Sequence, residues 1–315
     1  MNNLSAERLL RCGEDQWAAT LLQAALELGV FTELGRGPRT CAQLQRRLAL
    51  RGPGAADLLD ALVGLGWLDR EGDDPEAVYV NAREASHYLD ARSPASLAGW
   101  LGDAFMIATL AAASLVCALR GEPWTPWPLP VAALDVWAGL VGRALAQRIE
   151  LDSARTVFAS GGGAVHTACA LADGLEALQV IVQVARPELA PARDHIGAHG
   201  LAARVQAQAH DGVTPVDAVV VNRWWSAAGD PDAALQPART ALRTGGRLLW
   251  VDHWLDDSRR HSAPALVAVL RRRLAGDAPR AERVRDGRER CQAAGFTRTG
   301  HALLTGGLSV LQASV

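Results

Sequence analysis

The 315-residue sequence contains no lysine, because all 32 of its basic residues are arginine. Without lysine the chain cannot form a Schiff base with a carbonyl substrate or hold a nucleotide through a Walker-type phosphate loop. The chain also has 34 acidic residues, so its formal net charge is −2. A balance this close to zero gives no electrostatic reason to expect nucleic acid or an anionic membrane as a partner.

Cysteine is scarce as well, and the five that occur lie far apart without a CxxC pair. This pattern excludes a disulfide framework and a zinc site and is typical of reduced thiols in the cytoplasm. The N-terminus lacks the basic and apolar segments of a signal peptide, and the most apolar stretch, residues 104–119, is shorter than the ~20 residues that span a bilayer. We therefore expect a cytoplasmic protein without a bound metal.

The first 98 residues have the pattern of a winged helix, which is three helices followed by a β-hairpin. Apolar residues at helical spacing and turn residues predict helices at 17–34, 40–50 and 52–68, then a hairpin with its turn at Gly72 and Asp73. Many winged helices bind DNA through the third helix. Here that helix carries Asp57 and Asp60 and no arginine, so we expect it to contact protein and not phosphate.

The remainder of the chain changes from helices to an alternation of strands and helices. Residues 99–150 are predicted to be helical, with a break at the proline- and tryptophan-rich segment 121–130. From residue 151 onward, short apolar strands are separated by helices, which predicts a parallel, doubly wound sheet. The predicted strands are 156–159, 178–184, 203–209, 217–221 and 246–254, followed by two antiparallel strands near the C-terminus.

A glycine-rich turn, in "TVFASGGGAVHTA" (residues 156–168), joins the first of these strands to its helix. Turns of this kind cradle a nucleotide with backbone amides, and the preceding strand normally ends in an acidic residue. We expect Phe158 at that place, so the acidic contact is predicted to be missing. Gly161, Gly162 and Gly163 preserve the tight turn itself.

This layout resembles the small-molecule S-adenosylmethionine-dependent O-methyltransferases of natural-product pathways. The motifs that carry the resemblance include "LLDALVGLGWLDREG", "ALRTGGRLLWVDHWL" and "CQAAGF". It implies an α/β protein with a Rossmann-like methyltransferase fold and an N-terminal, mostly helical winged-helix dimerisation domain. It also implies a homodimer and a small-molecule substrate. The expected domains are a dimerisation domain at 1–98, a helical linker at 99–150 that lines the substrate pocket, and a Rossmann-like domain at 151–315.

The resemblance also implies where a cofactor would lie. The family's second strand ends in an acid that binds the ribose hydroxyls, and here that place falls on Gln183. A glutamine amide binds hydroxyls more weakly than a carboxylate does. Asp211 matches the family's acidic residue at the adenine end. We interpret Gly161, Gly162, Gly163, Gln183 and Asp211 as vestigial cofactor contacts and expect no cofactor, with S-adenosylmethionine as the alternative.

The family's general base is a histidine after the fourth strand, and ungapped alignment places Ser226 there. Serine is not a base near neutral pH, and no histidine lies between residues 211 and 252. The acid–base candidates are therefore His253, which Asp252 either orients or faces away from, and His166, whose pKa a helix N-terminus would lower. The alternative for each is a structural histidine. Glu282 roughly matches a family glutamate that positions the missing histidine.

A set of aromatic residues is expected to wall the substrate pocket, which predicts a flat aromatic ligand. The predicted substrate-binding residues are Trp124, Trp127, Trp137, Trp224, Trp225, Phe105, Met106 and Arg223. Arg223 would hold an anionic group or cap a surface. For any single tryptophan the alternative is that it fills core volume.

Three functions follow from these residues. The leading hypothesis is a methyltransferase-like enzyme repurposed for cyclisation, isomerisation or rearrangement of an aromatic, polyketide-like intermediate. The second is a divergent O-methyltransferase that acts on a small-molecule hydroxyl. The third is a non-catalytic partner of an active paralogue, paired through helix faces that carry Leu22, Leu26 and Leu62.

Overall fold

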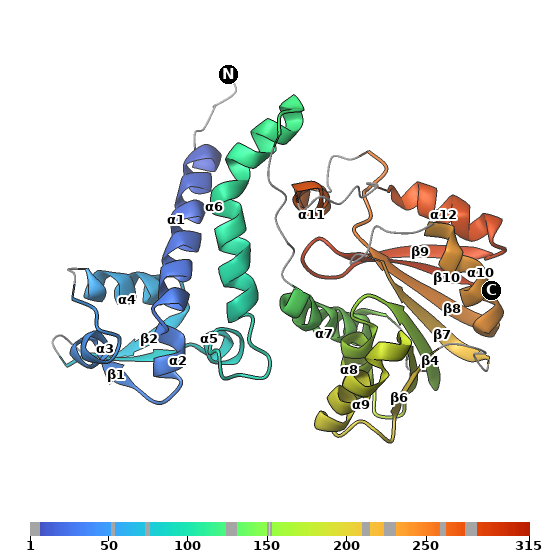
Figure 1. Ribbon diagram of the computed structural model, residues 1–315, viewed down its shortest axis with the longest axis horizontal. Helices are drawn as coiled ribbons and strands as arrows, with labels where there is room; N and C mark the ends of the chain where they lie inside the picture. Colours follow the sequence, from blue (N-terminus) through green and yellow to red (C-terminus); the bar gives the residue numbers. More distant parts are fainter. Residues whose placement is uncertain are drawn as a thin grey trace. The chain divides into compact units, whose positions relative to one another are not determined.

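The chain divides into two compact units, Met1–Glu122 (unit 1) and Pro123–Val315 (unit 2), each of which is described by itself (Figure 1). Of the two helices expected within residues 99–150, the first belongs to unit 1 and the second to unit 2. The computed structural model describes residues 7–51, 54–72, 76–123, 131–149, 151, 153–209, 215–223, 231–258, 263–274 and 282–315.

Unit 1 contains six helices among its described residues and a small antiparallel sheet in the order β1-β3-β2. This is the predicted winged-helix arrangement, and β2 and β3 form the predicted hairpin. The elements are α1 (Glu7–Glu27), α2 (Val30–Leu34), β1 (Arg39–Thr40), α3 (Cys41–Arg47), α4 (Ala55–Gly64), β2 (Leu68–Glu71), β3 (Val78–Asn81), α5 (Arg83–Tyr88) and α6 (Ala98–Arg120).

Local sequence signals account for the boundaries of these helices. Thr40 caps α3, because its hydroxyl accepts from the Gln43 amide while the Gln43 side chain accepts from the Thr40 amide. The single helix predicted over 17–34 is wrong in one respect. Gly29 adopts a left-handed conformation with φ of 73°, which ends one helix and starts the next, so α1 and α2 are separate.

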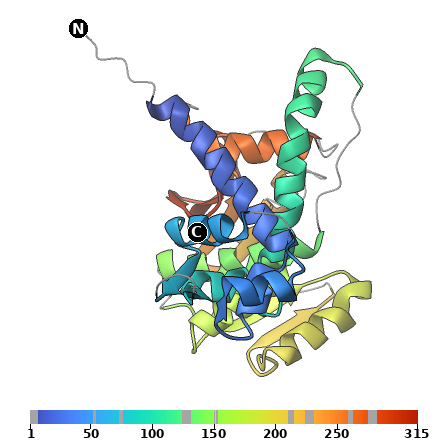
Figure 2. The ribbon, with the colours of Figure 1, turned by 90° about the vertical axis from the view of Figure 1, so that its left-hand side faces the viewer.

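The core of unit 1 is formed by leucines from several helices together with Phe31 and Tyr79. Leu22 and Leu62 belong to this core and are 7% and 0% exposed. They therefore hold the unit together and are not free helix faces, which corrects the pairing surface expected from the sequence. The long helix α6 packs along α1 within the same unit (Figures 1 and 2).

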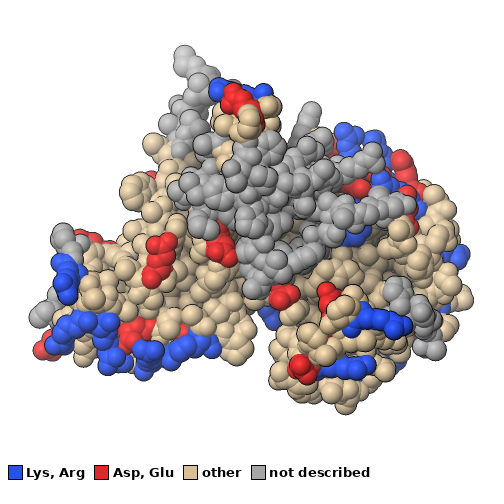
Figure 3. Space-filling model, viewed as in Figure 1, with Lys and Arg blue, Asp and Glu red and all other residues tan. Residues whose placement is uncertain are grey.

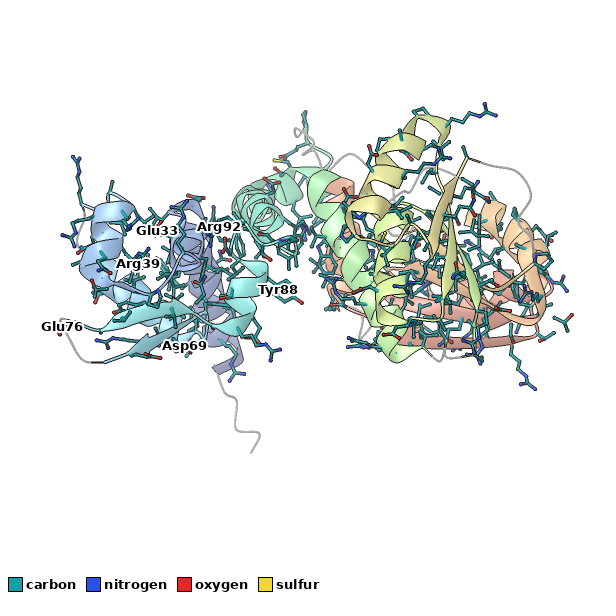
Figure 4. The ribbon with its side chains drawn as sticks, turned by 90° about the horizontal axis from the view of Figure 1, so that it is seen from below. Glu33, Arg39, Asp69, Glu76, Tyr88 and Arg92 are labelled. Carbon is teal, nitrogen blue, oxygen red and sulfur yellow. The ribbon has the colours of Figure 1, made fainter. Side chains whose placement is uncertain are left out.

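Unit 1 contains a cluster of arginines around one buried glutamate. The buried Glu33 pairs with Arg36, Arg39 and Arg47 at 2.9, 3.4 and 3.1 Å, and Glu33 and Arg39 are labelled in Figure 4. Blue (Lys and Arg) side chains lie along the lower edge of unit 1, at the left of Figure 3. The hairpin carries Asp69 and Glu76 (Figure 4) together with Arg70, which pairs with Asp60 of α4 at 3.6 Å.

Unit 2 contains a seven-stranded sheet in the order β6-β5-β4-β7-β8-β10-β9. The strands from β6 to β8 are parallel and β10 is antiparallel to both neighbours, as the sequence predicts. The elements are α7 (Val131–Arg148), β4 (Thr156–Gly161), α8 (Ala164–Gly174), β5 (Gln179–Gln183), α9 (Leu189–Ala198), β6 (Val205–Gln208), β7 (Val216–Asn222), α10 (Leu235–Ala241), β8 (Leu242–Asp252), α11 (Ala263–Leu274), α12 (Val284–Ala293), β9 (Arg298–Leu303) and β10 (Ser309–Ser314).

Helices cover both faces of this sheet (Figure 1), and a hydrophobic core lies on each face. Side chains alternate along each strand, so Ala218 and Val220 of β7 face α7, α8 and α9, while Val219 and Val221 face α10 and α12. Helices on both faces explain why the central strands are almost continuously apolar. The architecture is therefore a Rossmann-like, doubly wound sheet, and its carboxyl edge is where such sheets bind ligands.

None of the helices in the described part of the chain combines the length and the apolar character needed to cross a membrane.

Candidate functional site

The glycine turn lies at the carboxyl end of β4, where the sequence places it. Gly161 has φ of 92° and Gly163 has φ of 68°, a region of backbone space that other residues rarely adopt. A Cβ atom on Gly161 would lie 2.1 Å from the carbonyl oxygen of Asn222 on β7. Only glycine therefore allows β4 and β7 to approach this closely. The turn leads directly into α8, whose first amides point toward the sheet edge.

Phe158 is not at the end of β4, where the sequence predicted it, because the strand is longer than expected; that Phe158 holds the place of the family's acidic residue stays a prediction. The strand continues to Gly161, and Phe158 pairs with Ile181 and Val219 in the middle of the sheet. Its ring is 8% exposed and packs in the core beneath α10 and α12. Phe158 is accounted for by packing alone. The strand nevertheless contains no carboxylate, since its sequence is TVFASG.

Gln183 is the last residue of β5, as predicted, and stands next to Gln208 of β6. The turn and Gln183 together fit a nucleoside-containing cofactor: backbone amides lie beside a side-chain amide that hydrogen-bonds hydroxyl groups. Neither β4 nor β5 ends in a negatively charged residue. Asp211 lies outside the described residues.

A buried hydrogen-bond network ties the turn to its surroundings, and the sequence analysis missed it. Asn222, 2% exposed, donates through Nδ2 to Thr167 Oγ1 at 2.9 Å and to the Gly162 carbonyl at 3.3 Å. Thr167 in turn donates to the Ala138 carbonyl of α7 at 3.0 Å. The only sequence signal is a single asparagine that ends the apolar run DAVVVN. The network fixes β7, the turn, α8 and α7 relative to one another.

Arg223 follows Asn222 and belongs to a cluster of charges on the face beneath α10 and α12. Its Nη1 atom lies 3.9 Å from Glu282 Oε2, and its guanidinium stands 5.5 Å from the centre of the Trp250 ring. Glu282 is 7% exposed and accepts a 2.9 Å hydrogen bond from Arg290 Nη1. Glu282, which matches a family glutamate that positions a histidine, is therefore paired with Arg290 here.

His166 lies on the opposite face of the sheet, between α7, α8 and α9. Its Nδ1 atom is 3.4 Å from Asp135 Oδ1, and its ring centre is 4.1 Å from that of His195, which is itself 4.4 Å from that of His199. Burial, followed by the charge of His199, lowers the pKa of His166 to about 4. The direction agrees with the prediction, but burial and not the helix N-terminus is the leading cause.

His253 and Asp252 lie at the end of β8. The Asp252 carboxylate accepts a 2.7 Å hydrogen bond from the backbone amide of His253. This hydrogen bond fixes the main chain at the strand end, and the orientation of the imidazole by Asp252 stays a prediction. A catalytic role for His253 stays a prediction.

Trp137 packs over the turn between β9 and β10. Its indole occupies the space above Gly306, where a Cβ would lie 2.0 Å from the ring. The residue is thereby explained by packing in unit 2, and substrate contact stays a prediction. Phe105 packs against the core of unit 1. The other predicted site residues, which are Trp124, Trp127, Trp224, Trp225, Ser226 and the side chain of Met106, lie outside the described part of the structure.

Within the described ranges, no group of three or more histidine, cysteine, aspartate or glutamate side chains is arranged to hold a metal ion. What the described residues form is a backbone turn and a strand-end amide, with a charged cluster beside them. They lie at the carboxyl edge of a Rossmann-like sheet, where such folds bind ligands.

Comparisons with known proteins agree with this class. Residues 15–91 match the O-methyltransferase dimerisation domain. The chain is 29% identical to the tetracenomycin polyketide synthesis 8-O-methyl transferase TcmO of Streptomyces glaucescens, over 83% of this chain and 82% of that protein. It is 25% identical to the 3-hydroxy-5-methyl-1-naphthoate 3-O-methyltransferase of Streptomyces sahachiroi, over 81% and 78% of the two chains.

Among solved structures, human N-acetylserotonin methyltransferase in complex with SAM superimposes with a TM-score of 0.74 at 20% identity, covering 99% of this chain and 98% of that one. At this identity the likeness concerns the fold. Together, the matching dimerisation domain, the curated relatives and this shared fold show that the chain is similar to O-methyltransferases and has a Rossmann-like methyltransferase fold with an N-terminal dimerisation domain.

Proposed function

We propose that this protein is an S-adenosylmethionine-dependent O-methyltransferase that acts on a hydroxyl group of an aromatic natural-product intermediate. The observation that carries the proposal is the glycine turn, which is held against β7 by a contact that only glycine permits. A turn kept this tight supports the retention of a nucleoside ligand. The activities of the curated relatives support the reaction type.

The residues of this chain have distinct parts in the proposed function. Gly161, Gly162 and Gly163 hold the backbone amides toward the ligand, and Gln183 hydrogen-bonds the ribose hydroxyls. When bound, S-adenosylmethionine supplies an electrophilic methyl group. The network from Asn222 through Thr167 to α7 keeps the turn in place. The dimerisation domain provides a homodimer, as the family match supports.

A second candidate function is a cyclisation, isomerisation or rearrangement without productive use of the methyl donor. Specific residues favour it: Gln183 is uncharged, β4 offers no carboxylate, and Ser226 stands where the family has its histidine. Such a reaction depends on positioning and hydrogen bonding and needs no methyl donor.

Calorimetry on the full chain separates the two candidates. O-methyl transfer predicts that S-adenosylmethionine and its demethylated product both bind, and that the isotope label of a methyl-labelled donor appears on an aromatic hydroxyl. If neither compound binds at millimolar concentration, the methyltransferase proposal is wrong and the second candidate takes its place. Binding of the donor without any labelled product from a broad panel of phenols would also favour the second candidate.

A further inference from the structure

We propose that Arg223 binds an oxyanion of the substrate, and hence that the substrate carries an oxygen ionised at neutral pH, such as a carboxylate or an acidic enol. The inference rests on the proposed function, because it names the chemical class of the molecule that is methylated. It concerns one side chain at the carboxyl edge of the sheet and the charges around it.

The position of Arg223 is fixed by the strands. It directly follows Asn222, which pairs with Gly161 across β7 and β4, so Arg223 emerges beside the glycine turn. Its backbone amide donates to the Val251 carbonyl at 3.0 Å, which also ties it to β8. Ligands of open α/β sheets bind at this edge, so the backbone of Arg223 lies beside the place where a substrate is expected.

The neighbouring carboxylate forms an ion pair with Arg223 but accepts no hydrogen bond from it. Glu282 accepts its short hydrogen bond from Arg290, whereas Arg223 Nη1 is 3.9 Å from the same oxygen, too far for a hydrogen bond. Among the described residues, Arg223 Nη1 has no hydrogen-bond partner. Asp232 lies on the Arg290 side of the cluster, 3.6 Å from its Nε, and is half exposed. Two guanidinium groups therefore share one buried carboxylate.

The side chain is also held in place before any ligand arrives. Its guanidinium stands over the ring of Trp250, which is itself 1% exposed, and the Arg223 side chain keeps 19% of its surface exposed. A planar guanidinium fixed on an aromatic ring loses little freedom when it binds a carboxylate or another delocalised oxyanion. The geometry suits an anion better than a neutral hydroxyl.

An ionised substrate would also explain the residue at the family's base position. An oxygen that enters the site without its proton requires no general base, and Ser226 is then sufficient there. Arg223 would favour the ionised form over the neutral one and hold it at the sheet edge. By binding only substrate that is already ionised, the site would not need a histidine to remove a proton.

Binding of two probes of equal shape to the full chain, without S-adenosylmethionine, tests the proposal. The probes are 2-naphthoate, which is anionic at neutral pH, and 2-naphthamide, which is neutral, and tryptophan fluorescence or calorimetry reports their affinity. The wild type should bind the anion at least about tenfold more tightly, as expected for a charge-assisted hydrogen bond. Arg223→Gln should remove this preference, and Arg223→Lys should retain part of it.

Arg243→Gln is the matched control, because Arg243 pairs with Asp217 at the opposite edge of the sheet, 2.8 Å away. It should keep the preference of the wild type, and thermal unfolding should show that each variant is folded. The proposal is overturned if the wild type binds both probes equally, or if Arg223→Gln keeps the preference. Since no methyl donor is present, failure of the proposed methyl transfer leaves this outcome unaffected.

Discussion

Gln183 is the residue that most directly separates this chain from the pattern of its family. It ends β5 at the place where a carboxylate is expected to bind both ribose hydroxyls, and it offers a neutral amide instead. Hydrogen bonds to charged groups contribute roughly 1.5–3 kcal/mol, against roughly 0.5–1.5 kcal/mol for neutral ones. Under the proposed function, this single side chain is expected to set a measurable part of the cofactor affinity.

Gln183→Glu should therefore strengthen the binding of S-adenosylmethionine by about tenfold, because a carboxylate forms charge-assisted hydrogen bonds with both hydroxyls. Calorimetry on the variant and the wild type measures the change. Gln179→Glu is the control, since Gln179 begins the same strand at the opposite edge of the sheet and is exposed. Equal affinity of all three proteins would show that Gln183 does not contact the cofactor.

For individual residues, the sequence predicts the place of some in the fold and not of others. Gln183 was placed correctly at a strand end, because the apolar run of β5 stops there. The strand that holds Phe158 runs to Gly161, two residues past its predicted end at Ala159, because Ala159 and Ser160 carry no signal that distinguishes a strand from a turn. The charged cluster of Arg223, Glu282 and Arg290 joins distant segments, so spacing along the chain does not reveal it.

On the scale of secondary-structure elements, three helices meet at a cluster of imidazoles. Asp135 of α7, His166 of α8 and His195 of α9 face one another, and His199 stacks on His195. Burial, followed by the charges of His166 and His199, lowers the pKa of His195 to about 4, while Asp135 opposes this shift. Burial raises the pKa of Asp135, against the effect of His195. The helices therefore pack around uncharged rings.

This cluster should make unit 2 sensitive to mild acid. The pKa values of His166 and His195 are about 4 in the folded chain and ~6.5 in an unfolded one, so the unfolded state binds more protons between these values. Stability should fall as the pH is lowered through this window. Thermal unfolding from pH 7.5 to pH 4.5 measures it.

The double variant His166→Asn with His195→Gln should show a smaller loss of melting temperature over the same pH range. His87→Gln provides the control, because His87 is exposed on unit 1, outside the cluster. If the double variant loses stability with acid as steeply as the wild type, the pH dependence arises elsewhere.

For the molecule as a whole, the family match to residues 15–91 supports assembly through unit 1. The surface of this unit has an apolar groove between α1 and α4, lined by Leu10, Trp17, Leu21 and Leu65 among others. Trp17 is 69% exposed and Leu10 is 66% exposed. Large apolar side chains this exposed are expected to be covered by a partner.

Trp17→Glu should shift the protein from dimer to monomer, because it places a charge in an apolar interface. Sedimentation velocity at several protein concentrations measures the shift. Leu303→Glu is the matched control, since Leu303 is 71% exposed on β9 of unit 2 and lies outside the matched domain. A Trp17 variant that stays dimeric would place the interface on another surface of unit 1.

Taken by itself, the sequence determined the class of both domains, the order of the strands and helices, and the glycine turn. These depend on local signals, namely the periodicity of apolar residues, a capping threonine and the glycines that a tight turn requires. The tertiary structure decided which of the remaining polar residues share a site. It placed Arg223 against Glu282 and Trp250, and His166 with two other histidines on the opposite face. Such contacts depend on which face of a strand or helix each side chain occupies, and on which element covers that face, and only the packed fold specifies both.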